Sequence, residues 1–425
     1  MPELKHGDEN GLADTARRVL PGGGFGNVSH DIIIAEGRGG RVWDVGGNEY
    51  VDYLLGSGPM IVGHAHPEVV ETVREQAAKG TTFFTSNPPG IRLAAEIVDA
   101  VPCAEKVRFV SSGSEADLYA MRVARAYKKR DKILKFEGGY HGMSDYGLMS
   151  LAPKRAGNFP RPIPDSAGIP KSIGDEVLVA PFNDLEMVAS LVREHEQELA
   201  GIIVEPCQRL IPPRPGFLEG LRRVADENGL LLIFDEVVTG FRFAYGGAQT
   251  YYGVTPDICT LGKAIGGGFA LAAIAGRADI MAHFDRGTVA EDDFLPQIGT
   301  LSGNPIAAAA GLKTLEILKR PGAYEKIFAT GRALMDGYRD ALKTAGIDAR
   351  VVGEPPMFDV VFTDREVTDY RSALGNADRM KRCNGLLRER GVLKGESKYY
   401  VSLAHTEADV EHTLSAFTSS LAQLQ

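Results

Sequence analysis

Short apolar runs alternate with amphipathic, helix-length segments between about residues 90 and 280. Each run is rich in Val, Ile, Leu or Phe and has the length of a strand, and the segments between the runs have helical periodicity. This alternation is typical of buried parallel strands joined by helical crossovers. It predicts an α/β protein with a large, mainly parallel sheet. The candidate strands are residues 107–110, 132–136, 201–205, 230–235 and 271–276.

The chain on either side of this region has a different pattern. Residues 41–53 alternate in the manner of two strands around a Gly-Gly turn, which predicts a hairpin. After about residue 315, helical segments alternate with short strands near 350–362 and 399–404, which indicates a smaller α+β domain. A chain of 425 residues exceeds one typical core. We therefore expect an N-terminal segment that joins the small domain (1–70), a large domain (71–315) and a C-terminal small domain (316–425).

Charge and cysteine content narrow the classes of function. The net charge of -9 argues against nucleic acid as a main partner, because phosphate contacts need a basic face. No apolar run reaches the length of a membrane span, and residues 1–10 lack the apolar core of a signal peptide. The four cysteines are widely spaced, with neither a metal-ligand nor a disulfide pattern. A cytoplasmic protein without a metal centre is expected.

A lysine lies between an apolar run and three glycines in the stretch Asp257 to Gly268. Loss of solvation around Lys263 would favour the neutral amine, the nucleophile that Schiff-base chemistry needs. A solvent-facing lysine at a strand end explains the same local pattern equally well. The apolar run that ends on Asp235, 28 residues upstream, changes this balance. An aspartate at the carboxyl end of a parallel strand can hold the proton of a pyridine nitrogen, so together the two residues suggest pyridoxal phosphate.

The segment after the first predicted strand begins a helix. Ser112 and Glu115 have the spacing of a capping box, and apolar residues follow on one helical face. Small residues at a helix N-terminus leave backbone N–H groups open to an anion, and the helix dipole adds partial positive charge. Any capping box has this pattern, so it is a weak phosphate signal by itself.

Other polar residues follow the predicted strands. Tyr140 and His141 lie on a glycine-flanked turn, where an aromatic ring could stack on a flat ligand or simply pack. Glu205 and Gln208 follow another strand. The polar turn 299–305 fits either a phosphate ligand or a plain helix entry.

With these motifs assembled, the chain resembles the class III, pyridoxal-phosphate-dependent aminotransferases, and within them the glutamate-1-semialdehyde 2,1-aminomutase subgroup. The resemblance runs from about residue 21 to the carboxyl terminus. It implies fold type I, with a seven-stranded, mainly parallel sheet in the large domain and a smaller α+β domain. The motifs that carry it are Gly63-His64-Ala65-His66-Pro67, Ser112-Gly113-Ser114-Glu115-Ala116, Tyr140-His141-Gly142, Phe234-Asp235-Glu236-Val237, Thr239-Gly240-Phe241-Arg242, Leu261-Gly262-Lys263, Gly299-Thr300-Leu301-Ser302-Gly303-Asn304-Pro305 and Ser402-Leu403-Ala404-His405-Thr406.

The resemblance also implies a role for each site residue. Lys263 would form the Schiff base with the cofactor and then shuttle the proton, Asp235 would pair with the pyridinium nitrogen, and Tyr140 would cover one ring face. The remaining cofactor contacts would come from Ser112, Gly113 and Ser114 at the phosphate, His141, Glu205 and Gln208 around the ring, with the last two near its phenolic oxygen, and Val237 on the second ring face. Thr300 would reach the phosphate from the neighbouring subunit, which implies a homodimer with its active site at the interface.

Departures from the aminomutase pattern bear on the substrate. Ser29 stands where the aminomutase has an arginine that grips the substrate carboxylate, and Ser57 stands where it has a tryptophan. Gln208 is of the type found in the aminotransferases. We therefore expect transfer between two molecules, from an amine or β-amino acid to a keto acid. The alternatives are the aminomutase itself and a non-catalytic ligand-binding protein, which would be expected to lack Lys263.

Overall fold

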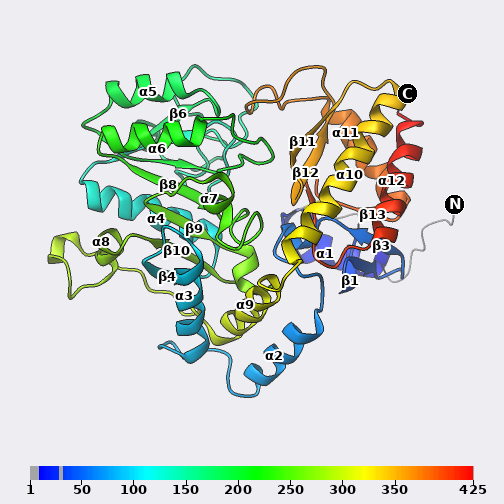
Figure 1. Ribbon diagram of the computed structural model, residues 1–425, viewed down its shortest axis with the longest axis horizontal. Helices are drawn as coiled ribbons and strands as arrows, with labels where there is room; N and C mark the ends of the chain where they lie inside the picture. Colours follow the sequence, from blue (N-terminus) through cyan, green and yellow to red (C-terminus); the bar gives the residue numbers. More distant parts are fainter. Residues whose placement is uncertain (1–8, 28–31, 425) are drawn as a thin grey trace. The chain divides into compact units, whose positions relative to one another are not determined.

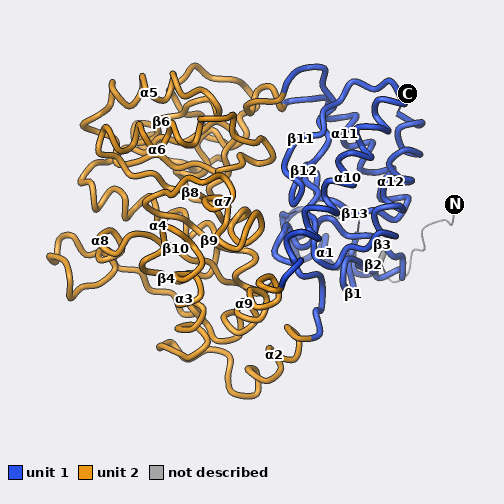
Figure 2. The backbone as a smooth tube through the Cα atoms, in the orientation of Figure 1, with its two compact units in different colours: residues 1–67, 321–366, 374–425 blue, residues 68–320, 367–373 orange. Residues whose placement is uncertain are grey.

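The computed structural model describes residues 9–27 and 32–424, with the side chains of residues 9 and 10 left aside. The chain forms two compact units (Figure 2). The large unit comprises residues 68–320 and 367–373, and the small unit comprises 1–67, 321–366 and 374–425. The expected division of the chain into residues 1–70, 71–315 and 316–425 stays a prediction. Ser29 lies outside the described residues.

A seven-stranded sheet forms the centre of the large unit. Pairing is parallel throughout except at one strand, Ala272–Gly276, which runs antiparallel to both of its neighbours. The expected α/β fold with a mainly parallel seven-stranded sheet is thus confirmed. In spatial order the strands are β4 (Lys106–Val110), β10 (Ala272–Gly276), β9 (Ile258–Leu261), β8 (Leu231–Glu236), β7 (Leu199–Val204), β5 (Lys132–Phe136) and β6 (Val177–Ala180).

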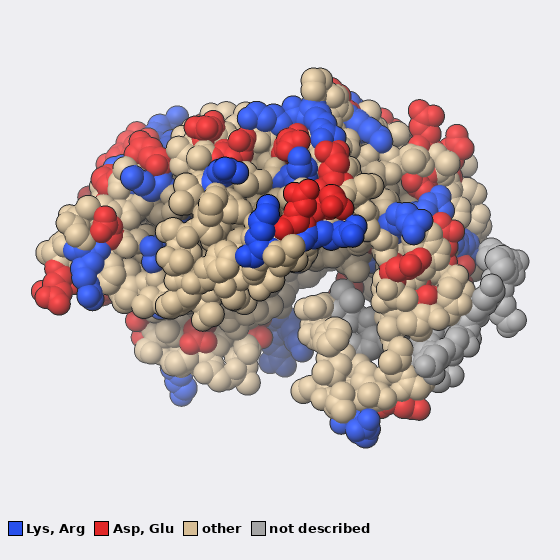
Figure 3. Space-filling view, turned by 90° about the horizontal axis from the view of Figure 1, so that it is seen from below, with Lys and Arg blue, Asp and Glu red and all other residues tan. Residues whose placement is uncertain are grey.

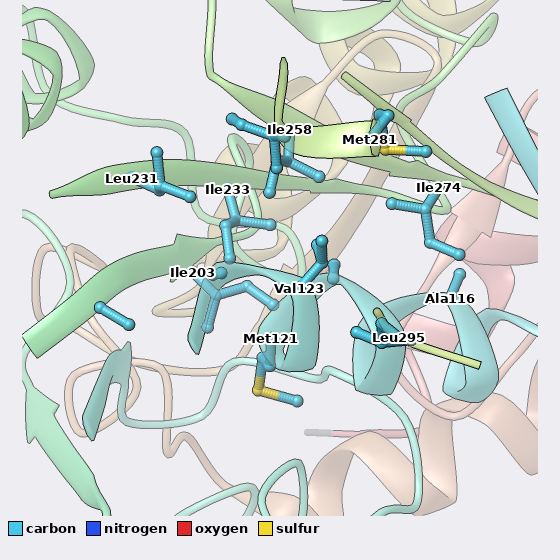
Figure 4. Close-up of a cluster of buried hydrophobic side chains, with 14 of the residues drawn as sticks. Ala116, Met121, Val123, Ile203, Leu231, Ile233, Ile258, Ile274, Met281 and Leu295 are labelled. Atoms are coloured by element: carbon cyan, nitrogen blue, oxygen red, sulfur yellow. The ribbon is translucent and has the colours of Figure 1, made fainter. Parts of the chain in front are cut away.

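The strands of this sheet are buried because both faces are covered. Every position of β6, β7, β8, β9 and β10 is buried, which explains why these segments are almost continuously apolar. On one face, Met121 and Val123 of helix α4 (Gly113–Lys128) pack toward Ile203, Ile233 and other strand residues (Figure 4).

The helices of the large unit connect the strands (Figure 1). Helix α3 starts where Asn87 caps the amide of Gly90, and two prolines follow in its first turn, where a missing N–H costs nothing. Besides α4, the helices are α2 (Pro67–Ala77), α3 (Pro88–Ala100), α5 (Leu185–Glu194), α6 (Phe217–Glu227), α7 (Gly247–Tyr252), α8 (Ala278–Met281) and α9 (Pro305–Leu318).

The small unit contains two smaller sheets and four α-helices among its described residues. The predicted hairpin forms as β2 (Arg41–Asp44) and β3 (Glu49–Asp52), which pair antiparallel. The first sheet has the order β1 (Ile34–Arg38), β2, β3 and β13 (Val392–Leu393), and the second has β11 (Arg350–Glu354), β12 (Met357–Val361) and β14 (Tyr399–Tyr400). The helices are α1 (Glu9–Val19), α10 (Ala323–Ala345), α11 (Ala377–Glu389) and α12 (Glu407–Leu421).

The core of the small unit includes a buried aromatic cluster. The rings of Tyr338 and Phe417 stack with their centroids 3.9 Å apart, and the rings of Phe358 and Tyr399 stack at 5.2 Å. Burial raises the pKa of Tyr338 and of Tyr399 well above their ordinary value. Tyr399 is therefore a packing residue of this unit.

The surface carries both signs of charge. On the face in Figure 3, the basic side chains (blue) and the acidic ones (red) are interspersed among larger uncharged areas. No helix in residues 9–27 or 32–424 is long and apolar enough to cross a membrane.

Candidate active site

The carboxyl ends of four parallel strands bring the predicted site residues to one edge of the sheet. Tyr140 and His141 follow β5, Glu205 follows β7, Asp235 lies near the end of β8, and Lys263 comes two residues after the end of β9. The β8–β9 pairing places Asp235 opposite Thr260 and Glu236 opposite Leu261. This edge is where ligands bind in open α/β sheets.

Asp235 is held by donors from three directions. His141 Nδ1 lies 2.8 Å from Asp235 Oδ2, and the amide of Val237 donates to Oδ1 at 3.1 Å. The Thr260 hydroxyl lies 3.3 Å from the same Oδ1. The three donors belong to the sheet or to the loops that follow its strands, and Asp235 itself is buried. The carboxylate is therefore fixed in position before any ligand binds.

Two buried polar atoms beside this aspartate have no hydrogen-bond partner: His141 Nε2 and Gln208 Oε1. The other end of each group is occupied, by Asp235 in the first case and by the carbonyl of Glu137, 2.8 Å from Gln208 Nε2, in the second. Both unpartnered atoms lie close to Gly139, where an added Cβ would come within 3.0 Å of His141 Nε2 and 3.5 Å of Gln208 Oε1. Buried polar atoms of this kind usually have a partner, so the site has hydrogen-bonding capacity for a ligand.

Lys263 begins a short 3₁₀ helix, Lys263–Gly266, and its side chain is half-buried. Its φ of 46° lies in the left-handed region, which non-glycine residues rarely adopt. Unusual backbone conformations of this kind cluster at functional sites, where surrounding structure holds them. Here the rigid, fully buried strand β9 on one side supplies that support.

The N-terminus of α4 forms the predicted capping box. The Ser112 hydroxyl accepts from the amide of Glu115 at 3.2 Å, and Glu115 Oε2 accepts from the amides of Ser112 and Ser111 at 2.8 and 2.9 Å. These bonds leave the amides of Gly113 and Ser114 in the open first turn, where an α-helix has no internal acceptor for them. An anion could bind there.

Tyr140 and Val237 occupy defined positions around this edge. The amide of Tyr140 donates to Glu205 Oε2 at 2.9 Å, and burial raises the pKa of its half-buried phenol. Val237 Cγ1 lies 3.0 Å from the point where a Cβ would stand at Gly113 and at Gly262. Glycine is therefore needed at both positions for the valine to pack between them.

The structure shows a further buried carboxyl group close to the site, Asp117, which the sequence analysis missed. It lies on α4 and is 2% exposed, and the Thr260 hydroxyl lies 2.7 Å from its Oδ1. Burial, together with the nearby charge of Asp235, raises the pKa of Asp117 well above its ordinary value. A signal was present in the sequence, because Asp117 is in helical register with the apolar residues Ala120, Met121 and Ala124.

A second missed feature is an ion pair behind Gln208. Arg371, in the short segment 367–373 of the large unit, donates from Nε and Nη2 to the Glu137 carboxylate at 2.7 and 3.0 Å. Tyr370 covers Gly138, where an added Cβ would come within 2.5 Å of its ring. Residues 137 and 371 are far apart in the sequence, so no local sequence pattern could predict this contact.

The remaining predicted residues lie elsewhere. Thr300 is on an exposed loop, where its carbonyl lies 3.4 Å from the hydroxyl of Thr82. Ser57 is exposed in the small unit. Arg242, the last residue of the motif Thr239-Gly240-Phe241-Arg242, is 1% exposed and belongs to the interior of the large unit.

Comparisons with known proteins agree with this fold. An omega-transaminase from Sphaerobacter thermophilus is 34% identical with a TM-score of 0.93, and the match covers 98% of this chain and 97% of that one. A β-phenylalanine aminotransferase from Variovorax paradoxus is 29% identical, with a TM-score of 0.86 and coverage of 98% and 94%. A glutamate-1-semialdehyde aminomutase from Pseudomonas aeruginosa PAO1 is 25% identical, with a TM-score of 0.87 and coverage of 99% and 95%.

The fold and these structures define a transaminase-type enzyme. Residues 25–417 match the family model of the class III aminotransferases, and the chain belongs to this family. The resemblance expected from the sequence motifs is thus confirmed.

Proposed function

We propose that this enzyme transfers an amino group from an amine or β-amino acid to a keto acid, with pyridoxal phosphate held at the carboxyl edge of the large sheet. Class III aminotransferases use this cofactor, which supplies an aldehyde that condenses with amines and a ring that withdraws electrons from the substrate. The observation that carries the proposal is the pairing of β8 and β9, because it brings Asp235, on β8, and Lys263, which follows β9, to one edge of the sheet.

The residues at this edge fit pyridoxal phosphate. Asp235 is a buried carboxylate, the group needed to hold a proton on a pyridine nitrogen. His141 orients it through Nδ1 and keeps Nε2 unpartnered. Gln208 has an unpartnered carbonyl oxygen, and Glu205 accepts from the amide of Tyr140 and so holds the turn that carries this tyrosine. We assign both residues to positions near the phenolic oxygen of the cofactor ring.

The phosphate and the ring faces complete the assignment. The amides of Gly113 and Ser114 at the start of α4 would bind the phosphate, and Ser112 would shape the turn through the capping box. Tyr140 and Val237 would cover the two faces of the ring. Lys263 would carry the proton at its Nζ between the substrate carbon and the cofactor.

A homodimer is part of the proposal, with Thr300 donating to the phosphate across the subunit boundary. The loop that carries Thr300 is flanked by exposed apolar side chains, Ile298 at 80% and Leu301 at 46%. Phe84, 70% exposed, lines a hollow of about 460 Å³ together with Ile298. Exposed apolar groups of this size favour burial against a partner. We also propose a cytoplasmic location, which is consistent with four buried free cysteines.

The choice of donor rests on Ser57 and Ser29 and on the relatives. Serine at these two positions, in place of the arginine and the tryptophan of the aminomutase, favours donors without an α-carboxylate. The similarity to an omega-transaminase and to a β-phenylalanine aminotransferase supports the same choice. The alternative is the aminomutase reaction within one molecule, and the similarity to such an enzyme at 25% identity keeps it as the second candidate.

A donor panel tests this function. The purified enzyme would be offered aromatic amines and β-amino acids with pyruvate, and separately glutamate-1-semialdehyde with no acceptor. We expect alanine to form with at least one panel donor and to depend on pyruvate. Formation of 5-aminolevulinate without acceptor, together with no conversion of any panel donor, would favour the aminomutase instead.

The variant Lys263→Ala is the matched control for the panel. It should keep the fold of the enzyme and lose turnover with every donor. Residual turnover at the wild-type rate would show that the activity comes from a contaminant or from another residue.

A further inference from the structure

A second buried carboxyl group, Asp117, lies close to Asp235. Asp117 projects from α4 toward the paired strands β8 and β9, and it is 2% exposed. The Thr260 hydroxyl connects the two acids, at 2.7 Å from Asp117 Oδ1 and 3.3 Å from Asp235 Oδ1. Asp117, Thr260 and Asp235 thus form a continuous chain of hydrogen-bonding groups.

The number of hydrogens in this chain is limited. A threonine hydroxyl has one hydrogen to donate, yet here it is flanked by two carboxyl oxygens. Two ionised carboxylates in a buried site would repel each other strongly. A chain in which one carboxyl keeps its proton satisfies both oxygens, because that carboxyl donates to Thr260 Oγ1 and Thr260 donates to the other acid.

The surroundings identify which acid keeps the proton. Asp235 has an amide donor from Val237 and a ring nitrogen donor from His141, and both stabilise an anion. Asp117 is buried, and the residues one turn further along its helix, Ala120 and Met121, are apolar and buried too. Its pKa is raised well above the ordinary value by burial first and by the charge of Asp235 second. Asp117 is therefore the neutral member of the pair.

Two other charged groups face Asp117 from neighbouring strands. The Glu205 carboxylate, after β7, raises its pKa further. Lys135, on β5, favours the charged form of Asp117, but its ammonium group donates to the carbonyls of Gly147 and Met149 at 2.9 and 2.6 Å. Burial lowers the pKa of Lys135 itself to about 7. The lysine is thus a weak counter-charge, and the neutral form of Asp117 prevails.

We propose that Asp117 is a positioning residue that acts as a neutral carboxylic acid and, through the Thr260 hydroxyl, holds the Asp235 carboxylate in a fixed orientation. Asp117 donates to Thr260 Oγ1, and Thr260 donates to Asp235 Oδ1, with no bond made or broken. The proposal rests on the proposed function in one respect, namely that Asp235 faces the ring nitrogen of pyridoxal phosphate. An anion that is already oriented would hold that nitrogen's proton without first reorganising.

The first test uses the cofactor-free protein and does not depend on activity. Infrared difference spectroscopy should find the carbonyl band of a protonated, buried carboxyl in the wild type at neutral pH. That band should be missing in Asp117→Asn. If the Asp117→Asn spectrum loses an ionised-carboxylate band instead, Asp117 is charged and the proposal is wrong.

The second test compares three variants of the holoenzyme. Asp117→Asn replaces the acid by a neutral group that still donates, so kcat/KM should stay within about threefold of the wild type and the pH dependence of the cofactor absorbance should be unchanged. Asp117→Ala and Thr260→Val both break the chain, and each should lower kcat by about ten- to a hundredfold, with a shifted pH dependence and little change in KM.

The outcomes separate this proposal from the proposed function. If Asp117→Asn is as impaired as Asp117→Ala, the negative charge is what matters, and the proposal is overturned. If Asp117→Ala does not fold, the Asp117→Asn and Thr260→Val variants still decide the question. A wild-type protein that neither binds pyridoxal phosphate nor transaminates contradicts the proposed function, whereas the infrared result on the cofactor-free protein stands by itself.

Discussion

Two lysines of the large unit differ in what their amines can reach. Lys135 is 2% exposed, and its Nζ is enclosed by two backbone carbonyls. Its pKa, lowered by burial to about 7, makes it a partly neutral amine at physiological pH. Lys263 is half-buried and follows β9 at the ligand edge. A neutral amine is not sufficient for cofactor chemistry, because the amine must also be accessible.

Borohydride reduction of the holoenzyme tests this distinction. We expect a stable cofactor adduct on the peptide that contains Lys263, since an amine next to an aldehyde condenses and reduction fixes the product. Peptide mass spectrometry should find Lys135 unmodified in the same digest, which makes it an internal control. An adduct on Lys135 would contradict the assignment of Lys263.

Adjacent acids on β8 have different roles because successive strand residues face opposite sides. Asp235 faces His141, whereas Glu236 is fully buried and accepts from Thr239 at 3.0 Å and from Gln249 at 2.9 Å. Glu236 thus fastens the end of the strand to α7, and burial raises its pKa.

Exchanging each acid for its amide should separate these roles. Asp235→Asn should keep the fold and lower kcat by at least about a hundredfold, because the proton on the ring nitrogen is no longer held by a charge. Glu236→Gln should lower the thermal midpoint of the apoenzyme and keep kcat within a few fold. Steady-state kinetics and thermal unfolding of both variants provide the measurement. Equal kinetic losses in the two would refute the distinction.

At the scale of elements, the capping box of α4 stabilises the helix start at which we propose that the phosphate binds. Glu115→Ala removes the acceptor for the amides of Ser111 and Ser112. We expect a loss of about 1–2 kcal/mol in the free energy of unfolding of the apoenzyme, the usual cost of a lost cap. Cofactor release should also be faster, because the helix start would be less ordered.

A matched control is Glu186→Ala, which removes an exposed acid from the first turn of α5. That acid acts through the helix dipole, so its removal should cost about 0.3–1 kcal/mol and leave cofactor release unchanged. Urea unfolding and the dissociation rate of the cofactor would be measured for both variants. Similar release rates in both would mean that α4 does not bind the phosphate.

The sequence predicted the elements where local patterns are strong. The strands near residues 132–136 and 230–235 and the hairpin around Gly46 were recognisable, because long apolar runs and turn residues act locally. The strand Val177–Ala180 was missed, because a run of only four apolar residues gives a weak signal. The reversed direction of β10 was not predictable, since strand direction depends on connections that cross the whole sheet.

The candidate site shows the same limit. Lys263, Asp235 and Ser112 lie in motifs of adjacent residues, and their neighbours in sequence revealed them. Asp117 and Arg371 act through residues that are more than a hundred positions away, so only the fold brings them to the site. Contacts between sequence-distant side chains have no local pattern to read.

At the scale of the whole molecule, the small unit contains a pH-sensitive group. His405 is fully buried, its ring is 4.4 Å from that of Tyr53, and Nε2 donates to the carbonyl of Asp52 at 3.0 Å. Burial lowers its pKa from 6.5 to about 4. The unfolded chain therefore binds a proton between these values that the folded chain does not bind.

Stability should consequently fall as the pH decreases from about 6.5 to 4, by up to about 3 kcal/mol from this group. Urea unfolding of His405→Gln should show a lower stability at neutral pH but a smaller loss on acidification. The control, His412→Gln, changes an exposed histidine and should keep the wild-type pH dependence. An unchanged pH dependence in His405→Gln would exclude His405 as its source.

Assembly can be tested through the loop that carries Thr300. Ile298→Glu places a charge on a side chain that is 80% exposed, so it should disrupt a dimer and release the cofactor without unfolding the protomer. Leu374→Glu, at a position 61% exposed in the small unit, should leave the dimer intact. Sedimentation and cofactor absorbance would measure both effects. A fully active monomer would contradict a shared phosphate site.

The packing of Val237 between Gly113 and Gly262 sets the separation between the start of α4 and the turn that carries Lys263. In the proposed site the helix start binds the phosphate and the lysine turn faces the aldehyde, so the covalent skeleton of pyridoxal phosphate would set the separation that these two segments need. Val237 Cγ1 lies 3.0 Å from the point where a Cβ would stand on either segment, at Gly113 and at Gly262. The valine therefore acts as a spacer between the two segments. Engineering of the donor pocket should leave this valine and both glycines unchanged. A larger side chain at any of the three positions would push the two segments apart, and they would no longer fit the cofactor.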